Sequence, residues 1–327
     1  MNSEHKSTVM VKNKQNTALK ESKMVKTVTV RKGVRNFFLD IIRGICIGVA
    51  FIIPGFSGGS VAAILGIYER LINAIADIFK DFKNSIKTLL PIAIGMVVGI
   101  VALLFPLGWA LSAFPLPTVS LFVGLALGGL PSVTDKLKGG TISCGKIASF
   151  IIAMIIVFSI SFLPLSTDKN LLNLSFGGYV ILFFIGILGS SALVIPGISG
   201  SMLLLILGYY NPIINLITKH LLAGENIKTS ILVLGATVLG IAVGFIGISV
   251  IMKVLFRKYP KATYAAILGF IIGSVPTIYI STAKEAGMTF STLPTSAVHW
   301  IACVLLFAVG FVLTYALVLY SRKHAVK

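Results

Sequence analysis

The sequence contains the same interrupted apolar motif twice. Residues 53–75 read IPGFSGGSVAAILGIYERLINAI, and residues 195–217 read IPGISGSMLLLILGYYNPIINLI. Twelve of the 23 aligned positions are identical at an offset of 142, and both copies contain a Pro-Gly-x-Ser-Gly turn. A second pair of segments, 124–132 and 269–277, repeats at an offset of 145. The sequence therefore predicts a fold made of two related halves.

Long apolar segments surround both copies of the motif. Of the 327 residues, 56% are hydrophobic and 12% are charged, which is too few charges to cover the surface of a soluble protein of this length. This composition predicts an all-α polytopic membrane protein and excludes a soluble enzyme. The apolar segments are 37–53, 58–68, 88–112, 118–134, 147–165, 180–195, 200–210, 230–256, 262–280 and 298–320.

The segments beside each Pro-Gly turn are too short to cross a bilayer. A membrane-spanning helix needs about 20 apolar residues, whereas only about ten separate Gly58 from Glu69, the next charged residue. Each motif therefore predicts a re-entrant helical hairpin, broken where proline and glycine interrupt the helix. One hairpin plus three transmembrane helices in each half gives an odd number of crossings, which predicts an inverted repeat. The turn residues are Pro54, Gly55, Pro196 and Gly197.

The distribution of lysine and arginine predicts the orientation in the membrane. Beyond the N-terminal tail, twelve of these residues fall on one predicted side and four on the other, so the first side is cytosolic and both termini lie there. In this setting the net charge of +18 indicates no nucleic-acid partner. The predicted divisions are a disordered basic cytosolic tail (1–36), membrane repeat 1 (37–165), an outer linker (166–179), inverted membrane repeat 2 (180–320) and a cytosolic C-terminal tail (321–327).

The two turns are candidate binding sites for an anion. The half-helix after each turn directs its N-terminal N–H groups and its positive dipole end toward the membrane midplane, where a phosphate group would be stabilised. The serines stand at the N-cap positions of these half-helices. The alternative is that small residues permit close helix packing, which we favour for Gly66, Gly95, Gly99 and Gly208. The candidate phosphate-binding residues at the turns are Ser57, Gly58, Gly59, Ser60, Ser199, Gly200 and Ser201.

Few ionisable residues lie within the membrane region. Arg43 and Arg70 stand near the mouth of the first hairpin, where they either anchor the protein to lipid phosphates or form a cationic vestibule for an anionic headgroup. Glu69 and Asp40 are the candidates for proton or cation coupling, and Glu69 is also a candidate partner of Arg70. His220 and His299 fall at the outer edges of apolar segments and are interpreted as surface histidines.

The sequence has no pattern typical of an enzyme. It contains no P-loop, no Cys-His pair and no cluster of His, Asp and Glu with the spacing of a metal site. The three cysteines have unrelated spacings that predict neither disulfides nor metal ligands. We therefore expect no enzymatic activity, no metal and no cofactor.

Both copies of the motif resemble the bacterial polyprenyl-phosphate transporter family (PopT). The segments that carry the resemblance are RGICIGVAFIIPGFSGGSVAAILGIYERLI and its repeat, LVIPGISGSMLLLILGYY. The resemblance covers residues 37–320. It implies a flippase in the bacterial plasma membrane that returns undecaprenyl phosphate from the outer to the cytosolic leaflet for cell-wall polymer synthesis. The family pattern often has an acidic residue three positions before the first Pro-Gly, where this chain has Phe51. A coupling role for that carboxylate therefore does not carry over.

Three other functions remain open from the residues alone. A transporter of a small soluble anion would use the same half-helix ends. A scaffold for cell-envelope machinery would use the basic tail as a docking arm. An intramembrane lipid phosphatase is the weakest alternative, because the serines of the turns lack a base at the same membrane depth.

Overall fold

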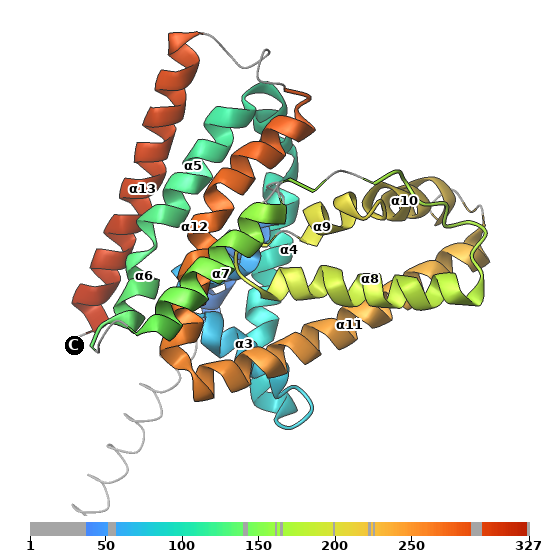
Figure 1. The fold of residues 1–327 in the computed structure, drawn as a ribbon, viewed down its shortest axis with the longest axis horizontal. Helices are drawn as coiled ribbons and strands as arrows, with labels where there is room; N and C mark the ends of the chain where they lie inside the picture. Colours follow the sequence, from blue (N-terminus) through green and yellow to red (C-terminus); the bar gives the residue numbers. More distant parts are fainter. Residues whose placement is uncertain are drawn as a thin grey trace, which may run out of the picture.

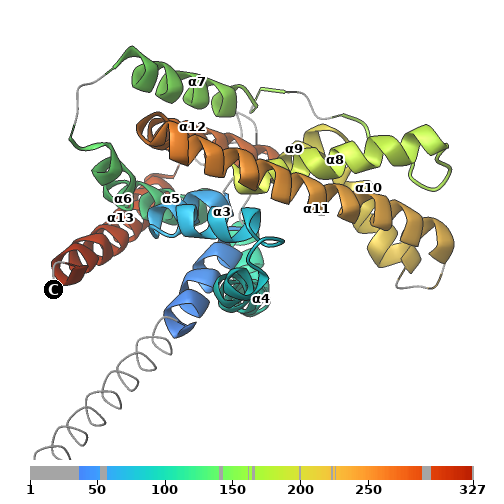
Figure 2. The same cartoon turned by 90° about the horizontal axis from the view of Figure 1, so that it is seen from below.

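The computed structural model describes residues 37–51, 57–139, 143–160, 162–163, 166–198, 200–221, 224, 226–288 and 296–325. These residues form helices, turns and loops, and no strand occurs among them, as the composition predicts. The predicted tail 1–36, the turn residues Pro54 and Gly55, and Ser199 lie outside the described residues. The first described helix covers residues 37–50 and is the blue helix of Figure 2.

Among the described residues, five helices are long and apolar enough to cross a membrane. They are α4 (Phe82–Ala113), the run Pro115–Leu137 formed by α5 (Pro115–Gly128), α6 (Pro131–Thr134) and η1 (Asp135–Leu137), and α11 (Ile227–Lys258), α12 (Pro260–Glu285) and α13 (Ala297–Ala325). Two further apolar helices, α7 (Cys144–Ile160) and α8 (Phe176–Val194), are shorter. The protein is therefore a multi-pass membrane protein, in agreement with its composition.

The helices after the two Pro-Gly turns are short in both copies. The first motif continues as α2 (Gly58–Ile64) and α3 (Tyr68–Ala76), and the second as α9 (Gly200–Ile206), α10 (Tyr210–Asn215) and the π-helical turn η2 (Leu216–Leu221). Both α2 and α9 have seven residues and a length of about 10 Å, so neither crosses a bilayer alone. Because α2 and α9 begin 142 positions apart, the repeat in the sequence is also a repeat of local structure.

The structural repeat continues through the next two helices. Both α4 and α11 contain 32 residues, and they begin 145 positions apart. Each ends at an aromatic residue that precedes a proline, Phe114-Pro115 in one copy and Tyr259-Pro260 in the other. The backbone angles of Phe114 (φ −138°, ψ 62°) and Tyr259 (φ −134°, ψ 54°) are closely alike. A residue before proline disfavours the helical region, which explains why both helices end there.

The last helices of the two halves are exchanged. Helix α5 of the first half packs along α13 of the second, and α12 of the second half packs along α7 of the first (Figure 1). The contacts are close: a Cβ at Gly124 would lie 2.1 Å from the carbonyl oxygen of Phe307, and a Cβ at Gly269 would lie 2.1 Å from that of Phe150. The two halves of the sequence are therefore not separate packing units.

The remaining long helices pair within their own half. Helix 37–50 lies against α4, where a Cβ at Gly95 would be 2.0 Å from the carbonyl oxygen of Ile41. Helix α8 lies against α11 in the same way: a Cβ added at Gly240 would lie 2.0 Å from the carbonyl oxygen of Phe183. Gly95 and Gly99 thus serve close packing, as expected from the sequence.

The packing interpretation is wrong for Gly66 and incomplete for Gly208. Gly66 has φ +69°, and a Cβ there would have no neighbour within 4 Å, so this glycine serves the turn between α2 and α3. Gly208 has φ +75°, and a Cβ there would also lie 2.3 Å from the carbonyl oxygen of Thr167. Both glycines end a short helix in a left-handed conformation, which is a common C-terminal cap.

The core of the molecule surrounds α2. All residues of this helix except Val61 are buried, and they pack among helix 37–50 and helices α3, α5, α6, α8 and α12. A seven-residue helix with both ends inside the protein must have its backbone groups satisfied by protein or by water. The surroundings of α2 are therefore where a binding site inside the membrane region is to be sought.

Candidate anion-binding site

The two copies of the motif touch each other at the end of α8. The hydroxyl of Tyr68 donates a hydrogen bond of 2.8 Å to the carbonyl oxygen of Val194, and the contact is buried. The hydroxyl of Ser57 donates to the carbonyl oxygen of Ile195 at 3.4 Å. The last carbonyls of a helix lack partners within the helix. Side chains of the first motif therefore satisfy the backbone just before the second Pro-Gly turn.

Ser57 occupies the predicted N-cap position of α2 without capping it. Its backbone is extended (φ −114°, ψ 131°), as expected at an N-cap, but its side chain makes no hydrogen bond to an N–H of α2. Ser57 therefore stands at the predicted N-cap position, but its hydroxyl donates a hydrogen bond to the carbonyl oxygen of Ile195 and caps no N–H of α2.

The first turn of α2 contains an unpaired hydroxyl. Ser60 is 1% exposed, and its Oγ has no hydrogen-bond partner among the described residues. Gly58 and Gly59 beside it are also buried. Buried polar groups are nearly always hydrogen-bonded in native proteins, so an unpaired one needs a partner such as water or a ligand. Ser60 is thus the residue of this turn with free hydrogen-bonding capacity.

The second turn is fixed by its glycine. Gly197 has φ +84°, and a Cβ there would lie 2.4 Å from the carbonyl oxygen of Phe270 on α12. Pro196, Gly197 and Gly200 are buried. Ser199 lies outside the described residues, and the side chain of Ser201 is not described. Only glycine fits position 197 without displacing α12.

One carboxylate holds both predicted arginines. Nη1 of Arg43 lies 2.9 Å and Nη2 of Arg70 lies 2.5 Å from the same oxygen, Oδ1 of Asp40. The side chain of Asp40 is 6% exposed, whereas those of Arg43 and Arg70 are 33% and 42% exposed. The group has two positive charges and one negative charge. Because a guanidinium has five N–H donors, each arginine keeps donors for a further anion.

Glu69 does not pair with Arg70. Its carboxylate instead accepts a hydrogen bond of 3.1 Å from the hydroxyl of Tyr264 on α12. The proposed pairing of Glu69 with Arg70 is therefore wrong, because Arg70 turns to the buried carboxylate of Asp40. Tyr264 could not have been selected from the sequence, since it belongs to neither motif.

Helix α3 makes a second ionic contact, with α11. The ammonium group of Lys253 bonds to the carboxylate of Asp77, which follows the last residue of α3. A cavity of about 450 Å³ lies between α3 and α11, and Lys80 and Arg257 also line it. Polar contacts thus join α3 to helix 37–50, α11 and α12. The distribution of lysine and arginine in the sequence predicts that these charges face the cytosol.

The structure thus forms two groups from the predicted site residues. One joins Ser57 to the second motif, with Ser60 unpaired beside it, and the other joins Asp40, Arg43 and Arg70. No hydrogen bond or ion pair of the described residues connects the two groups. In the described part of the chain, no cluster of His, Cys, Asp and Glu has the arrangement of a metal site.

Comparison with known proteins identifies the family. Residues 47–292 match a family described as undecaprenyl phosphate translocase-like. The chain belongs to this family. The matched segment contains both copies of the motif, and it begins after Asp40 and Arg43. The family resemblance noted from the two motifs is thereby confirmed.

Two relatives match nearly the whole chain. A polyprenyl-phosphate transporter of Staphylococcus aureus is 31% identical over 287 residues, which is 86% of this chain and 95% of the relative. A polyprenyl-phosphate transporter of Vibrio cholerae is 24% identical over 323 residues, which is 88% of this chain and 98% of the relative. No solved structure matches the chain.

Proposed function

We propose that this protein moves polyprenyl phosphate across the cytoplasmic membrane of a bacterium. The names of both relatives and of the family support this substrate. The structural observation that carries the proposal is the arginine pair: Arg43 and Arg70 share the buried carboxylate of Asp40 and keep exposed donors. Such a group attracts a phosphate monoester, while the apolar helices around it are compatible with a lipid tail.

The phosphate path connects the arginine pair with the two turns. The phosphate is held by backbone N–H groups and small polar residues at the broken helices, and it leaves past the basic mouth formed by Arg43 and Arg70. The unpaired, buried hydroxyl of Ser60 supports this path. The proposed residues at the turns are Ser57, Gly58, Gly59, Ser60, Ser199, Gly200 and Ser201.

The proposed direction is from the outer to the cytosolic leaflet, which returns undecaprenyl phosphate for cell-wall polymer synthesis. The two halves form an inverted repeat with both termini in the cytosol, and each Pro-Gly turn forms a re-entrant hairpin. The lengths of α2 and α9 support the hairpins. The excess of lysine and arginine in the predicted cytosolic loops supports the orientation.

The exchanged helices restrict how the two halves of the sequence can move during transport. Rocking of one half of the sequence against the other would separate α5 from α13 and α12 from α7, all of which pack closely. We therefore propose that these four helices remain one body. The pairs formed by helix 37–50 with α4 and by α8 with α11 then move against it, carrying the two turns.

Inward movement of the phosphate requires a source of energy. A membrane potential that is negative inside opposes an entering anion by about 2.3 kcal/mol per charge for each 100 mV. A proton or cation that accompanies the lipid would remove this barrier. Glu69 is the better candidate for proton coupling, because the carboxylate of Asp40 is already bound to two arginines, whereas that of Glu69 accepts a hydrogen bond from a neutral tyrosine.

The test is transport of a fluorescent polyprenyl phosphate between the leaflets of proteoliposomes, read by a membrane-impermeant quencher. We expect movement with the wild type and a loss of at least tenfold in Arg43→Ala and in the double variant Ser57→Ala/Ser199→Ala. Lys138→Ala, which breaks an exposed ion pair with Asp135, is the matched control and should transport normally.

Different outcomes separate the alternatives. Uptake of inorganic phosphate without lipid movement, by correctly folded protein, would favour a small-anion transporter. Full transport in the serine double variant would refute the site at the turns. Loss of function on deletion of residues 1–36, with transport unchanged in liposomes, would favour the scaffold.

A further inference from the structure

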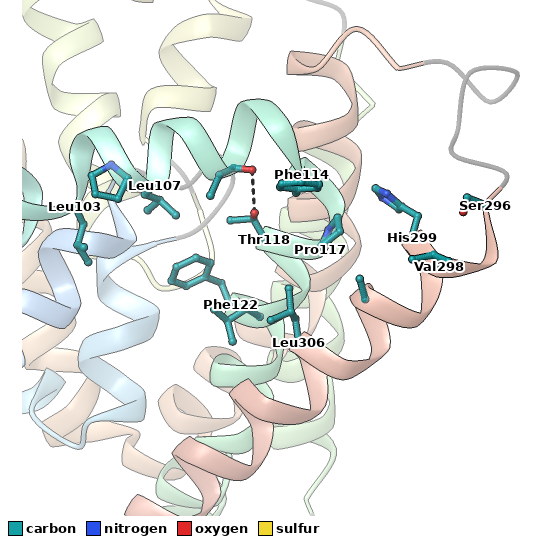
Figure 3. Close-up of a pocket in the computed structure, with 14 residues that line it drawn as sticks. Leu103, Leu107, Phe114, Pro117, Thr118, Phe122, Ser296, Val298, His299 and Leu306 are labelled. Carbon is teal, nitrogen blue, oxygen red and sulfur yellow. Dashed lines mark hydrogen bonds between the residues drawn. The ribbon is translucent and has the colours of Figure 1, made fainter.

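A second, apolar site lies apart from the arginine pair. A groove of about 700 Å³ runs between α4, α5 and α13 (Figure 3). Its walls are formed by Leu103 and Leu107 of α4, Phe114 between α4 and α5, Phe122 of α5, and Leu306 of α13. Its volume lies within the range of about 300–1,000 Å³ that is usual for pockets that bind small ligands. None of its lining residues belongs to the proposed phosphate path.

His299 contributes an unpaired polar atom to this groove. It stands in the first turn of α13 and points toward Pro117 and Phe114 (Figure 3). Its Nε2 atom is buried and has no hydrogen-bond partner in the described part of the chain. The prediction of a surface histidine is therefore wrong for this nitrogen. The hydroxyl of Thr118, also in the groove, is already bonded to the carbonyl oxygen of Ala110 at 3.1 Å.

Two tryptophans mark the depth of the groove in the membrane. The chain contains two, Trp109 on α4 and Trp300 on α13, and they are adjacent in sequence to the lining residues Ala110 and His299. Both are exposed. Tryptophan is enriched where the membrane meets water, so these residues place His299 near the level of the lipid headgroups. The predicted orientation makes this the outer side.

From this level the groove extends into the hydrocarbon region. His299 and Leu306 are seven positions apart, which corresponds to about 10 Å along α13. The site therefore combines one polar nitrogen at the interface with an apolar slot below it. A ligand that fits both parts is an amphiphile with a hydrogen-bond-accepting head and a hydrocarbon chain.

We propose that this groove binds polyprenyl phosphate in the outer leaflet before it reaches the arginine pair. The Nε2–H of His299 donates to a phosphate oxygen, and the first isoprene units lie along Leu306, Leu103 and Phe122. The rest of the chain stays in the lipid. The choice of a prenyl phosphate over other amphiphiles rests on the function proposed above, whereas the shape and polarity of the site rest on the geometry.

Binding is tested separately from transport. A photoreactive amino acid replaces Leu306 in the full-length protein, and a second variant carries it at Val304 as the control. Each variant is reconstituted in liposomes that contain radiolabelled polyprenyl phosphate, and crosslinking of the lipid to the protein is measured. Val304 is close to Ala302 of the groove in sequence but is 67% exposed and does not line it. We expect at least tenfold more labelling at Leu306 than at Val304. His299→Ala should reduce the labelling at Leu306 about tenfold, because a hydrogen bond to a charged group is lost.

Competition by unlabelled lipids identifies which head group and which hydrocarbon tail the groove binds. Unlabelled polyprenyl phosphate should abolish the labelling at Leu306, whereas polyprenol and phosphatidylglycerol should not. Competition by phosphatidylglycerol at equal strength would show a site for bulk lipid and overturn the proposal. Equal labelling at Leu306 and Val304 would overturn it as well.

Transport then separates this inference from the proposed function. Ala302→Phe fills the groove and should slow transport about tenfold, whereas Val304→Phe should not. Labelling without any transport by the wild type would refute the transport function and leave the groove as a lipid site. Normal transport by Ala302→Phe and by His299→Ala, without labelling at Leu306, would refute the groove alone. If Ala302→Phe does not fold, His299→Ala and the labelling experiment still decide.

Discussion

The hydroxyl of Tyr68 donates a hydrogen bond to the carbonyl oxygen of Val194, which joins the two copies of the motif across 126 positions of sequence. The bond is buried, and Tyr68 itself is 3% exposed. It lies next to the bond from Ser57 to Ile195, so two side chains of the first motif cover the last carbonyls of α8. This contact fixes the second Pro-Gly turn relative to α2 and α3.

Removing this hydroxyl should destabilise the protein. Tyr68→Phe leaves the carbonyl of Val194 buried without its partner, which costs about 1–3 kcal/mol of folding free energy. The matched control is Tyr210→Phe at the equivalent position of the second motif, where the side chain is exposed and the cost should be small. Unfolding in mixed detergent micelles measures both variants. Equal effects would show that the buried bond contributes little.

The sequence predicted the repeat because it depends on local signals. The short helices α2 and α9 follow Pro-Gly in the sequence, and α4 and α11 end before a proline, so both features follow from residues close in sequence. The sequence also grouped Arg43 with Arg70, and the structure brings both to Asp40. In these respects the sequence was sufficient.

The exchange of helices could not be predicted in the same way. Helices α5, α7, α12 and α13 are all apolar, and the spacing of their apolar residues does not predict which of them pack together. Their glycines indicate close contacts but not the partner. The pairing of Arg70 with Asp40 rather than with the adjacent Glu69 has a similar cause, because it depends on how α3 lies against helix 37–50.

The backbone at Gly197 should tolerate alanine less well than the backbone at Gly66. Both have positive φ, which costs a residue with a side chain about 1–2 kcal/mol. Gly66 has open space around it, whereas a Cβ at Gly197 would meet the carbonyl oxygen of Phe270 at 2.4 Å. Gly197→Ala should therefore be more destabilising than Gly66→Ala by denaturation in micelles. If the two variants are equally stable, α12 does not restrict this turn.

Asp40 should act by holding the two arginines in place. Asp40→Asn keeps the size of the side chain but removes the negative charge that Arg43 and Arg70 share. We expect slower transport in proteoliposomes and a lower stability, because both guanidinium groups lose their charged partner. Asp135→Asn removes the carboxylate of an exposed pair and serves as the control. Unchanged transport in Asp40→Asn would show that the arginines need no positioning.

The contact between Asp77 and Lys253 should be restored by exchanging the charges. This pair joins the end of α3 to α11, and its side chains are about one-third exposed. Either Asp77→Lys or Lys253→Asp alone places like charges together and should detach α3 from α11. The double variant reverses the pair and should recover much of the lost transport. A double variant no better than the single variants would show that transport does not depend on the opposite charges of this pair. Unimpaired single variants would show that α3 is held by its other contacts, from Arg70 to Asp40 and from Glu69 to Tyr264.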